Sequence, residues 1–331
     1  MATTILTTEL MQSTLDLGAE HNWNWTAASR ASGIDRSTLR HRADKARFAG
    51  LTPFKKPEKP RIRVPARSSY APVPDTHGES VRVLVWGCAH DSPSIPDKSR
   101  FANAGKLAAH LQPDYIVDLG DTMDMDSLST HAMPGSMDDR ERPFFKAEIA
   151  SLTDAISAFN EHAPSADDIP RIHLHGNHEN RAWRFENNNP TSQGVFTTEI
   201  DQVYARFGFT VKGFREWLYI SGVGFTHAPI NGMGREVGGV NANQTVARET
   251  THSVVWSHTH KREFIERPKF GVGNSIQVVN TGSFMPQGYL KAYAGLSMTG
   301  WTYGITELTL RDGQIESART WSELELRERF N

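Results

Sequence analysis

The stretch VRVLVWGCAH at residues 81–90 gives the clearest indication of the fold. Its short apolar run at 81–87 is typical of a buried strand. A second run, YIVDLGDTMD at 115–124, follows a segment at 99–111 that is predicted to be helical. Strand, helix and strand in this order predict a βαβ unit, and therefore an α/β domain.

The same alternation continues along the chain. Helices are predicted at 143–160 and near 197–207, with a strand at 172–175 between them. Beyond about residue 209 the pattern consists mostly of strands, which are predicted at 215–221, 223–227, 253–257, 275–280, 301–310 and 314–320. The chain from 79 to 331 is therefore predicted to form one large domain with extensive sheet structure.

Metal-binding side chains follow five of the predicted strands. They lie in the segments 88–90, 120–124, 176–179, at His227, and in 257–260. Ligands of α/β sheets bind where strand ends and their loops converge. The imidazoles, carboxylate and amide oxygen gathered in these segments suit two divalent ions.

In this order and spacing the segments resemble the signature of the calcineurin-like metallophosphoesterases. The resemblance spans about residues 81–285 and includes Asn-Thr-Gly-Ser at 280–283. The stretches 120–129 and 176–181 are most similar to the phage and prophage branch. The resemblance implies a four-layer αββα sandwich, in which two mixed sheets face each other and helices lie outside.

The resemblance also implies a role for each residue of the motifs. Asp121 would be the carboxylate that bridges both metals. The second metal would be bound by Asn177, His227 and His258, and the first by His90 and His260. His178 would act beside the phosphate as an acid or charge stabiliser, with Asp124 as its partner. A hydroxide held between the ions would attack phosphorus in line.

Cys88 departs from the family pattern, which has Asp at this position of the first motif. It is the only cysteine in the chain. A thiolate is a softer ligand and favours Zn²⁺ or iron over Mg²⁺ and Mn²⁺. Three interpretations are open: Cys88 is a ligand of the first metal, a small non-ligand beside a weakened or empty site, or an engineered or inactivating change. The candidate ions are two divalent metals, Mn, Zn or Fe, and a Cys88 ligand would favour Zn or Fe at the first site.

Two arginines are candidates for binding the substrate. Arg181 follows His178 on a predicted helix and could clamp a phosphate. Arg235 lies in the glycine-rich loop 231–239, which is expected to act as a mobile flap over the metals. His173, His175 and His252 alternate with apolar residues and are expected to be structural.

The N-terminal segment 26–47 resembles the helix-turn-helix of bacterial and phage DNA-binding proteins. Thr26 and Asp35 suit helix N-caps, and Gly33 suits the turn between two helices. The second helix, 35–47, would read DNA with the candidates Arg36, Ser37, Arg40, His41 and Lys45. The alternative is a small packing or docking module with solvated arginines.

Charge and proline content divide the chain into three parts. These are a helical domain at 1–50, a Pro-rich basic linker at 51–78 and a catalytic domain at 79–331. Residues 1–72 contain 12 Lys and Arg against 6 Asp and Glu, a net charge of +6, whereas the other 259 residues contain 24 against 32, a net charge of −8. A basic N-terminal part favours DNA as a partner.

Composition narrows the protein class further. The chain has 331 residues, one cysteine and a mean hydropathy of −0.50, which exclude an internal disulfide framework and are ordinary for a soluble globular protein. No apolar run reaches the roughly 18 residues of a membrane span. We expect a cytoplasmic protein from a bacterium carrying phage-derived genes. We expect no association with a membrane, and no obligate protein partner is evident from the sequence. The oligomeric state is left open.

These features predict a binuclear-metal-dependent phosphoesterase, specifically a phosphodiesterase or nuclease that acts on DNA. One alternative is a protein or nucleotide phosphatase that is merely localised to DNA. Another is a DNA-binding regulator that carries a degenerate phosphoesterase domain.

Overall fold

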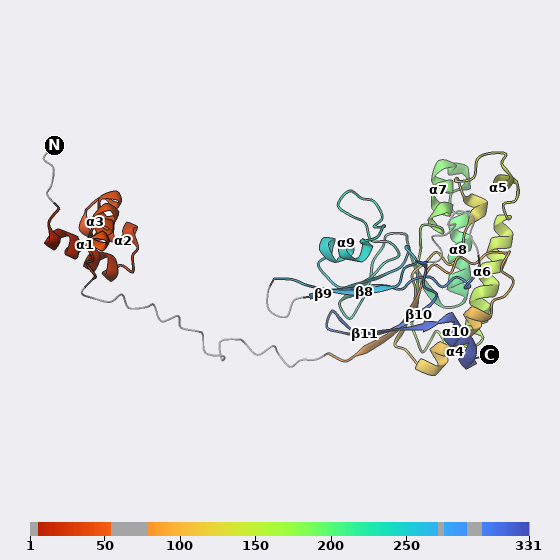
Figure 1. The fold of residues 1–331 in the computed structure, drawn as a ribbon. Coiled ribbons are helices and arrows are strands. Elements are labelled where there is room, and N and C mark those ends of the chain that lie inside the picture. The colour runs from red at the N-terminus through yellow and green to blue at the C-terminus, as the bar shows by residue number, and fades with distance from the viewer. Residues whose placement is uncertain (1–5, 54–77, 271–274, 290–299, 331) are drawn as a thin grey trace. The chain divides into compact units, whose positions relative to one another are not determined.

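A computed structural model describes residues 6–53, 78–270, 275–289 and 300–330 (Figure 1). The chain divides into two compact units, Met1–Asp75 and Thr76–Asn331. The linker predicted at 51–78 falls almost entirely on residues 54–77, which lie outside the described residues.

The N-terminal unit contains three helices: α1 (Thr8–Glu20), α2 (Trp25–Ser32) and α3 (Arg36–Phe48). Leu15 of α1 packs on Ala43 and Ala46 of α3, and Trp23 and Trp25 cover this small core. Both tryptophans therefore contribute to the core of this unit.

The turn between α2 and α3 has three residues. Gly33 has a φ of 70°, a conformation that glycine adopts without strain. Asp35 caps α3 by accepting a hydrogen bond from Ser37 N at 2.7 Å. The predicted cap of the preceding helix is shifted, because Asn24 and not Thr26 accepts the first backbone N–H groups of α2.

The larger unit contains two mixed sheets. The first has the order β11-β10-β1-β2-β3-β4. Its strands are β1 (Val81–Trp86), β2 (Tyr115–Asp118), β3 (Arg171–Leu174), β4 (Phe209–Lys212), β10 (Gly304–Arg311) and β11 (Gln314–Ser322). Strands β1 to β4 run parallel, and β10 pairs with β1 in the antiparallel sense.

The second sheet has the order β5-β6-β7-β9-β8. Its strands are β5 (Leu218–Ile220), β6 (Val223–Phe225), β7 (Val254–Trp256), β8 (Glu263–Pro268) and β9 (Ser275–Asn280). Strands β6, β7 and β9 are parallel. Both sheets therefore have a group of parallel strands whose carboxyl ends can supply loops to one site.

Alternate residues of β1 show how the layers pack. Leu84 and Trp86 belong to the core beneath the helices, whereas Val83 and Val85 belong to the core between the two sheets. The helices of the larger unit are α4 (Ser99–Leu111), α5 (Met137–Arg140), α6 (Phe145–Asn160), α7 (Asn180–Asn188), α8 (Phe196–Arg206), α9 (Ala242–Glu249) and α10 (Glu323–Phe330).

Helices cover the outer faces of both sheets (Figure 1). Residues of α4, α6, α8 and α10 share a core with the first sheet, and α9 packs on the second. The predicted four-layer αββα architecture is therefore confirmed. Strands β4 and β8 and helices α9 and α10 were not predicted, because these elements are short and, in β8, most side chains are exposed.

Two glycines let the loops after β2 and β3 touch. A Cβ atom at Gly120, which has a φ of +93°, would lie 2.3 Å from the backbone nitrogen of Gly176. A Cβ atom at Gly176 would lie 2.1 Å from Asp121 Oδ1. Only glycine permits this approach, which brings the two loops together at the strand ends.

Among the described residues, none of the helices combines the length and apolar character that a membrane span requires.

Candidate metal centre

Five loops from the two sheets meet at the carboxyl ends of their strands. They follow β1, β2 and β3 of the first sheet and β6 and β7 of the second. The side chains brought together are Cys88, His90, Asp121, Asp124, Asn177, His178, His227, His258 and His260. The structure therefore gathers every residue predicted for the metals and for the catalytic pair.

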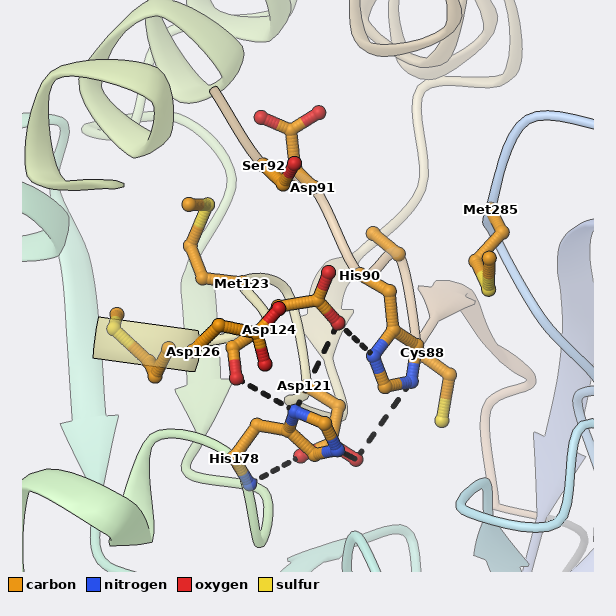
Figure 2. A network of polar contacts seen from close by, with 12 residues as sticks. Cys88, His90, Asp91, Ser92, Asp121, Met123, Asp124, Asp126, His178 and Met285 are labelled. Carbon is orange, nitrogen blue, oxygen red and sulfur yellow. Dashed lines mark hydrogen bonds and ion pairs between the residues drawn. The ribbon is translucent and has the colours of Figure 1, made fainter. Parts of the chain in front are cut away.

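Asp121 lies at the centre of this group. Its Oδ2 atom is 3.1 Å from His227 Nε2, 3.9 Å from His90 Nε2 and 4.0 Å from His178 Nε2. Figure 2 shows the imidazoles of His90 and His178 beside the Asp121 carboxylate. One carboxylate oxygen thus faces ring nitrogens that come from three loops.

His90 and His260 direct nitrogen atoms at each other. His90 Nδ1 is 3.0 Å from Asp124 Oδ1, which fixes the ring and leaves Nε2 directed inward. This Nε2 lies 3.0 Å from His260 Nε2. The two nitrogens form a pair that suits a shared cation, as the sequence predicted for the first metal.

His227 gives the clearest test of whether a cation fits. Its Nδ1 donates to Leu119 O at 2.8 Å, so in the neutral ring Nε2 carries a lone pair. That Nε2 lies 3.1 Å from both Asp121 Oδ2 and Asn177 Oδ1. Without a proton or a metal ion on Nε2 these contacts would bring acceptor atoms together, and such nitrogen and oxygen donors suit a divalent metal ion.

The charge states of most of the buried side chains agree with metal binding. Burial lowers the pKa of His260 to about 3 and that of His258 to about 4, so both rings are neutral at pH 7. Burial alone would lower the pKa of His227, but the Asp121 carboxylate raises it, so a metal ion must displace the proton that this ring holds. Burial opposes ionisation of Asp121, yet His227 and its neighbours hold the pKa of Asp121 well below its usual range. Neutral imidazole and carboxylate are the forms that bind metals.

Three clusters of candidate ligands result. In each, the ligand atoms lie within 4.8 Å of one another, and the clusters are Cys88, His90 and His260; Cys88, Asp121 and His227; and His90, Asp121 and His178. Cys88 belongs to two of the clusters, which places its sulfur between the two predicted metal sites. The His258 ring lies beside His227, with ring centroids 5.3 Å apart.

Cys88 is held in this position by the second sheet. Its Sγ accepts a hydrogen bond from His258 N at 3.1 Å and lies 3.0 Å from Ser257 Oγ. The side chain is fully buried, and burial together with Asp121 raises the pKa of the thiol well above its usual value. Loss of the thiol proton therefore requires a nearby cation, so the ligand role depends on metal binding.

Backbone conformation at the site is unusual. Five of the candidate ligands have positive φ angles: Cys88 (54°), His90 (42°), Asp121 (51°), His258 (74°) and His260 (60°). This region is unfavourable for residues with a Cβ atom, and such residues cluster at functional sites. The surrounding structure must hold these loops in place.

Glu179 supplies much of that support, and it was not among the predicted site residues. Its Oε2 accepts from the backbone nitrogens of Asp121 and Gly176, both at 2.9 Å. Its Oε1 accepts from Thr122 N at 2.8 Å. One buried carboxylate therefore ties together the loops after β2 and β3. The sequence signal is an acid directly after His178, but its partners in the loop after β2 are 57 and 58 residues away in the chain.

The predicted substrate arginines lie in different surroundings. Arg181 is buried, and its Nη1 donates to Asp124 O and to Asp126 Oδ1, both at 2.9 Å. This placement braces the loop after β2 next to His178, whose Nδ1 donates to the same carbonyl at 2.8 Å. Arg235 is exposed in the loop after β6. Contact of either arginine with substrate remains a prediction.

The DNA-binding candidates share one face of α3. The five residues Arg36, Ser37, Arg40, His41 and Lys45 are all exposed. Leu39, Ala43 and Ala46 of the same helix are buried. Helix α3 therefore has an apolar face toward the unit's core and a basic face toward solvent.

Glu148 of α6 anchors the segment after Asp124. Its carboxylate accepts from Asp126 N at 2.6 Å, from Ser127 N at 3.4 Å and from Ser127 Oγ. Burial is the largest influence on its pKa, which it raises to about 7. The carboxyl group therefore keeps its proton in the folded protein at a pH where the unfolded chain has lost it.

This shift predicts a specific pH dependence of stability. The unfolded chain releases the proton near pH 4.5 and the folded protein near 7, so the free energy of unfolding should fall by about 3 kcal/mol as pH rises between these values. Glu148→Gln should lose this component, whereas Glu161→Gln, an exposed acid after the same helix, should keep it. Urea denaturation at pH 5 and 7.5 measures the difference. Equal pH slopes in wild type and Glu148→Gln would contradict the assignment.

The Cys88 sulfur is expected to bind metal. The Co²⁺-loaded protein should show a sulfur-to-cobalt charge-transfer band, because Sγ lies within 4.8 Å of nitrogen and oxygen ligands of both predicted sites. Cys88→Ser should lose the band, and Cys88→Asp should bind two ions per chain without it. Absorption spectra with elemental analysis test this expectation. Two bound ions and no band in the wild type would show that Cys88 is not a ligand.

The family model described as calcineurin-like phosphoesterase matches residues 75–262. No curated protein shows significant sequence similarity to the chain.

Several solved structures resemble the chain at low identity. Yfce, a phosphoesterase from E. coli, is 16% identical, with 72% of this chain and 98% of that chain covered and a TM-score of 0.33. Purple acid phosphatase PPD1 from yellow lupin is 12% identical, with 76% and 55% covered and a TM-score of 0.37. Vps29 from Entamoeba histolytica is 13% identical, with 73% and 99% covered and a TM-score of 0.30.

The family match spans more than half of the chain and includes all five loops of the metal centre. The chain therefore belongs to the calcineurin-like phosphoesterase family.

Proposed function

We propose that the protein is a two-metal phosphodiesterase that cleaves DNA. The observation that carries the proposal is the group of inward-facing ligand atoms around Asp121 Oδ2, from His227 at 3.1 Å to His90 at 3.9 Å. The main obstacles to hydrolysing a phosphodiester are the negative charge of its oxygens and the weak nucleophilicity of neutral water. Bound divalent ions would neutralise the phosphate oxygens and lower the pKa of water. Asp121 would bridge the ions, with His90, His260 and Cys88 at one and Asn177, His227 and His258 at the other.

His178 is positioned to exchange a proton with the substrate. Its Nδ1–H donates to the Asp124 carbonyl, so Nε2 is the ring atom left to act. Burial lowers the pKa of His178, so a positive charge on the ring is favoured only when an anionic phosphate lies beside it. Asp124 also contacts His90, so one residue orients both rings.

The N-terminal unit supports DNA as the substrate. Its α2 and α3 are joined by a three-residue turn, and α3 exposes the basic residues Arg36, Arg40 and Lys45. A helix of this kind can enter the major groove and contact phosphates. A tether of this unit to the catalytic unit would raise the local concentration of DNA at the metal centre.

Replacing His178 should lower catalysis strongly. We expect His178→Ala to reduce kcat by about 10²- to 10⁴-fold on a DNA strand and on methyl p-nitrophenyl phosphate. His162→Ala, an exposed histidine outside the site, should not change kcat. Chelation should abolish turnover, and added Mn²⁺ or Zn²⁺ should restore it.

The substrates in this assay separate the proposal from its alternatives. Faster hydrolysis of p-nitrophenyl phosphate than of either diester would favour a phosphatase. A protein with no bound metal and no turnover under any divalent ion would be a DNA-binding regulator with a degenerate site.

Helix α3 should determine binding to duplex DNA. The double variant Arg40→Ala and Lys45→Ala should bind at least tenfold more weakly. The slope of log K against log salt should become less steep by about 2, because two phosphate contacts are lost. Arg206→Ala, an exposed arginine of α8, serves as the control. Fluorescence anisotropy over a salt series measures both quantities, and an unchanged affinity and slope would remove α3 from DNA binding.

A further inference from the structure

A groove leads away from the metal centre along helix α7. It contains a cavity of about 680 Å³ whose lining includes Asn177, Trp183, Arg184, Phe214 and Arg215. Asn177 connects the cavity to the metal centre, because its Oδ1 lies 3.1 Å from His227 Nε2. A molecule in this groove can therefore be continuous with a phosphate at the metals.

Trp183 is the most unusual residue of the lining. Helix α7 buries Arg181, Ala182 and Glu186, whereas Trp183 on its outer side is 56% exposed. An exposed indole that lines a cavity offers a flat apolar face with little loss of conformational freedom on binding. Nucleobases stack on aromatic side chains of this kind.

Two guanidinium groups in the groove can bind an anionic chain. One belongs to Arg215, which lies 2.5 Å from Glu236; the other acid of this lining, Asp201, lies 2.9 Å from the His175 ring. Arg184 is exposed and adds a guanidinium beyond these two pairs. Arginine next to a stacking platform is a common arrangement for binding bases and backbone phosphates together.

The groove continues beyond the indole. A second cavity of about 370 Å³ is lined by Trp183 and Thr197, which also line the first, and by residues that include Pro190, Gln193 and Glu186. The Glu186 carboxylate is buried and accepts from the backbone nitrogens of Phe196 and Thr197. A substrate that passes from the metals across Trp183 into this second cavity must be longer than one phosphate ester. The two linked cavities therefore fit successive units of a polymer.

We infer that this groove binds single-stranded nucleic acid, with one base stacked on Trp183 and a backbone phosphate on Arg184, next to the phosphodiester at the metal centre. A duplex keeps its bases stacked on one another, so a base reaches an indole at the groove wall only from a single strand or a frayed end. The inference rests on the proposed phosphodiesterase function and names the form of its substrate.

The first test compares two substrates of the full-length, metal-loaded protein. The ratio of kcat/KM for a single-stranded hexanucleotide to kcat/KM for methyl p-nitrophenyl phosphate should fall about tenfold in Trp183→Ala. The fall should appear mainly in the KM for the oligonucleotide, and Trp183→Phe should restore most of the ratio. Phe264→Ala removes a 50% exposed aromatic side chain outside the groove and should leave the ratio unchanged. An unchanged ratio in Trp183→Ala would overturn the inference.

The second test does not depend on hydrolysis. An oligonucleotide that carries 5-iodouracil is irradiated with the full chain in the presence of a chelator, and the crosslinked tryptic peptide is identified by mass spectrometry. A crosslink on the peptide that contains Trp183 supports the groove, even if no metal ion gives turnover and the proposed function fails. Crosslinks found only on other peptides would overturn the inference, even if the protein hydrolyses phosphodiesters.

Discussion

Lone pairs directed at one another in a buried site are the constraint on which the catalytic unit depends. His227 Nε2 lies at hydrogen-bonding distance from both Asp121 Oδ2 and Asn177 Oδ1, and when His227 is neutral this nitrogen has no proton to share with either oxygen. Such a group is stable only with a positive charge inside it. The same feature that makes the metal-free site electrostatically unfavourable makes it a strong cation site.

The rest of the fold holds these atoms in place. Parallel strands of two sheets end at a common edge, and tight loops carry the ligands at positive φ angles. Backbone strain of this kind persists only where neighbouring structure enforces it. Glu179 provides that enforcement for the loops after β2 and β3, and the Ser257–Cys88 contact joins a loop of the first sheet to one of the second. Rigid ligands need little reorganisation when charge develops on a phosphate.

Helix α7 links the candidate metal centre to the neighbouring groove. His178 and Arg181 both donate to the Asp124 carbonyl, whereas Trp183 and Arg184, farther along this helix, line the groove. Helix α7 thus braces the loop after β2 with Arg181 and lines the groove with Trp183 and Arg184. In the proposed function the N-terminal unit would bind duplex DNA, and the groove would receive a single strand, so the two units would recognise different forms of the same polymer.

Much of the fold and of the site could be predicted from the sequence, since each ligand follows an apolar strand and strand ends converge in α/β sheets. The ligand candidates from Cys88 to His260 were recognisable in this way, and the βαβ order predicted the helix at 99–111. The arrangement in two facing sheets was implied by the resemblance to the metallophosphoesterases, and the helical pair at 26–47 by the resemblance to helix-turn-helix proteins. Short or exposed elements such as β4, β8 and α9 lacked that periodic signal. The bracing position of Arg181 was also not evident, because its partners depend on how a loop folds over it.

By itself the sequence determined which chemical groups are available and the order in which strands deliver them. Only the tertiary structure decided where their lone pairs point, which acid holds the loops and which aromatic ring stands open to a groove. The physical reason is that direction, burial and charge state arise from contacts between residues such as Asp121 and Glu179, which are brought together only when the strand-end loops pack against each other.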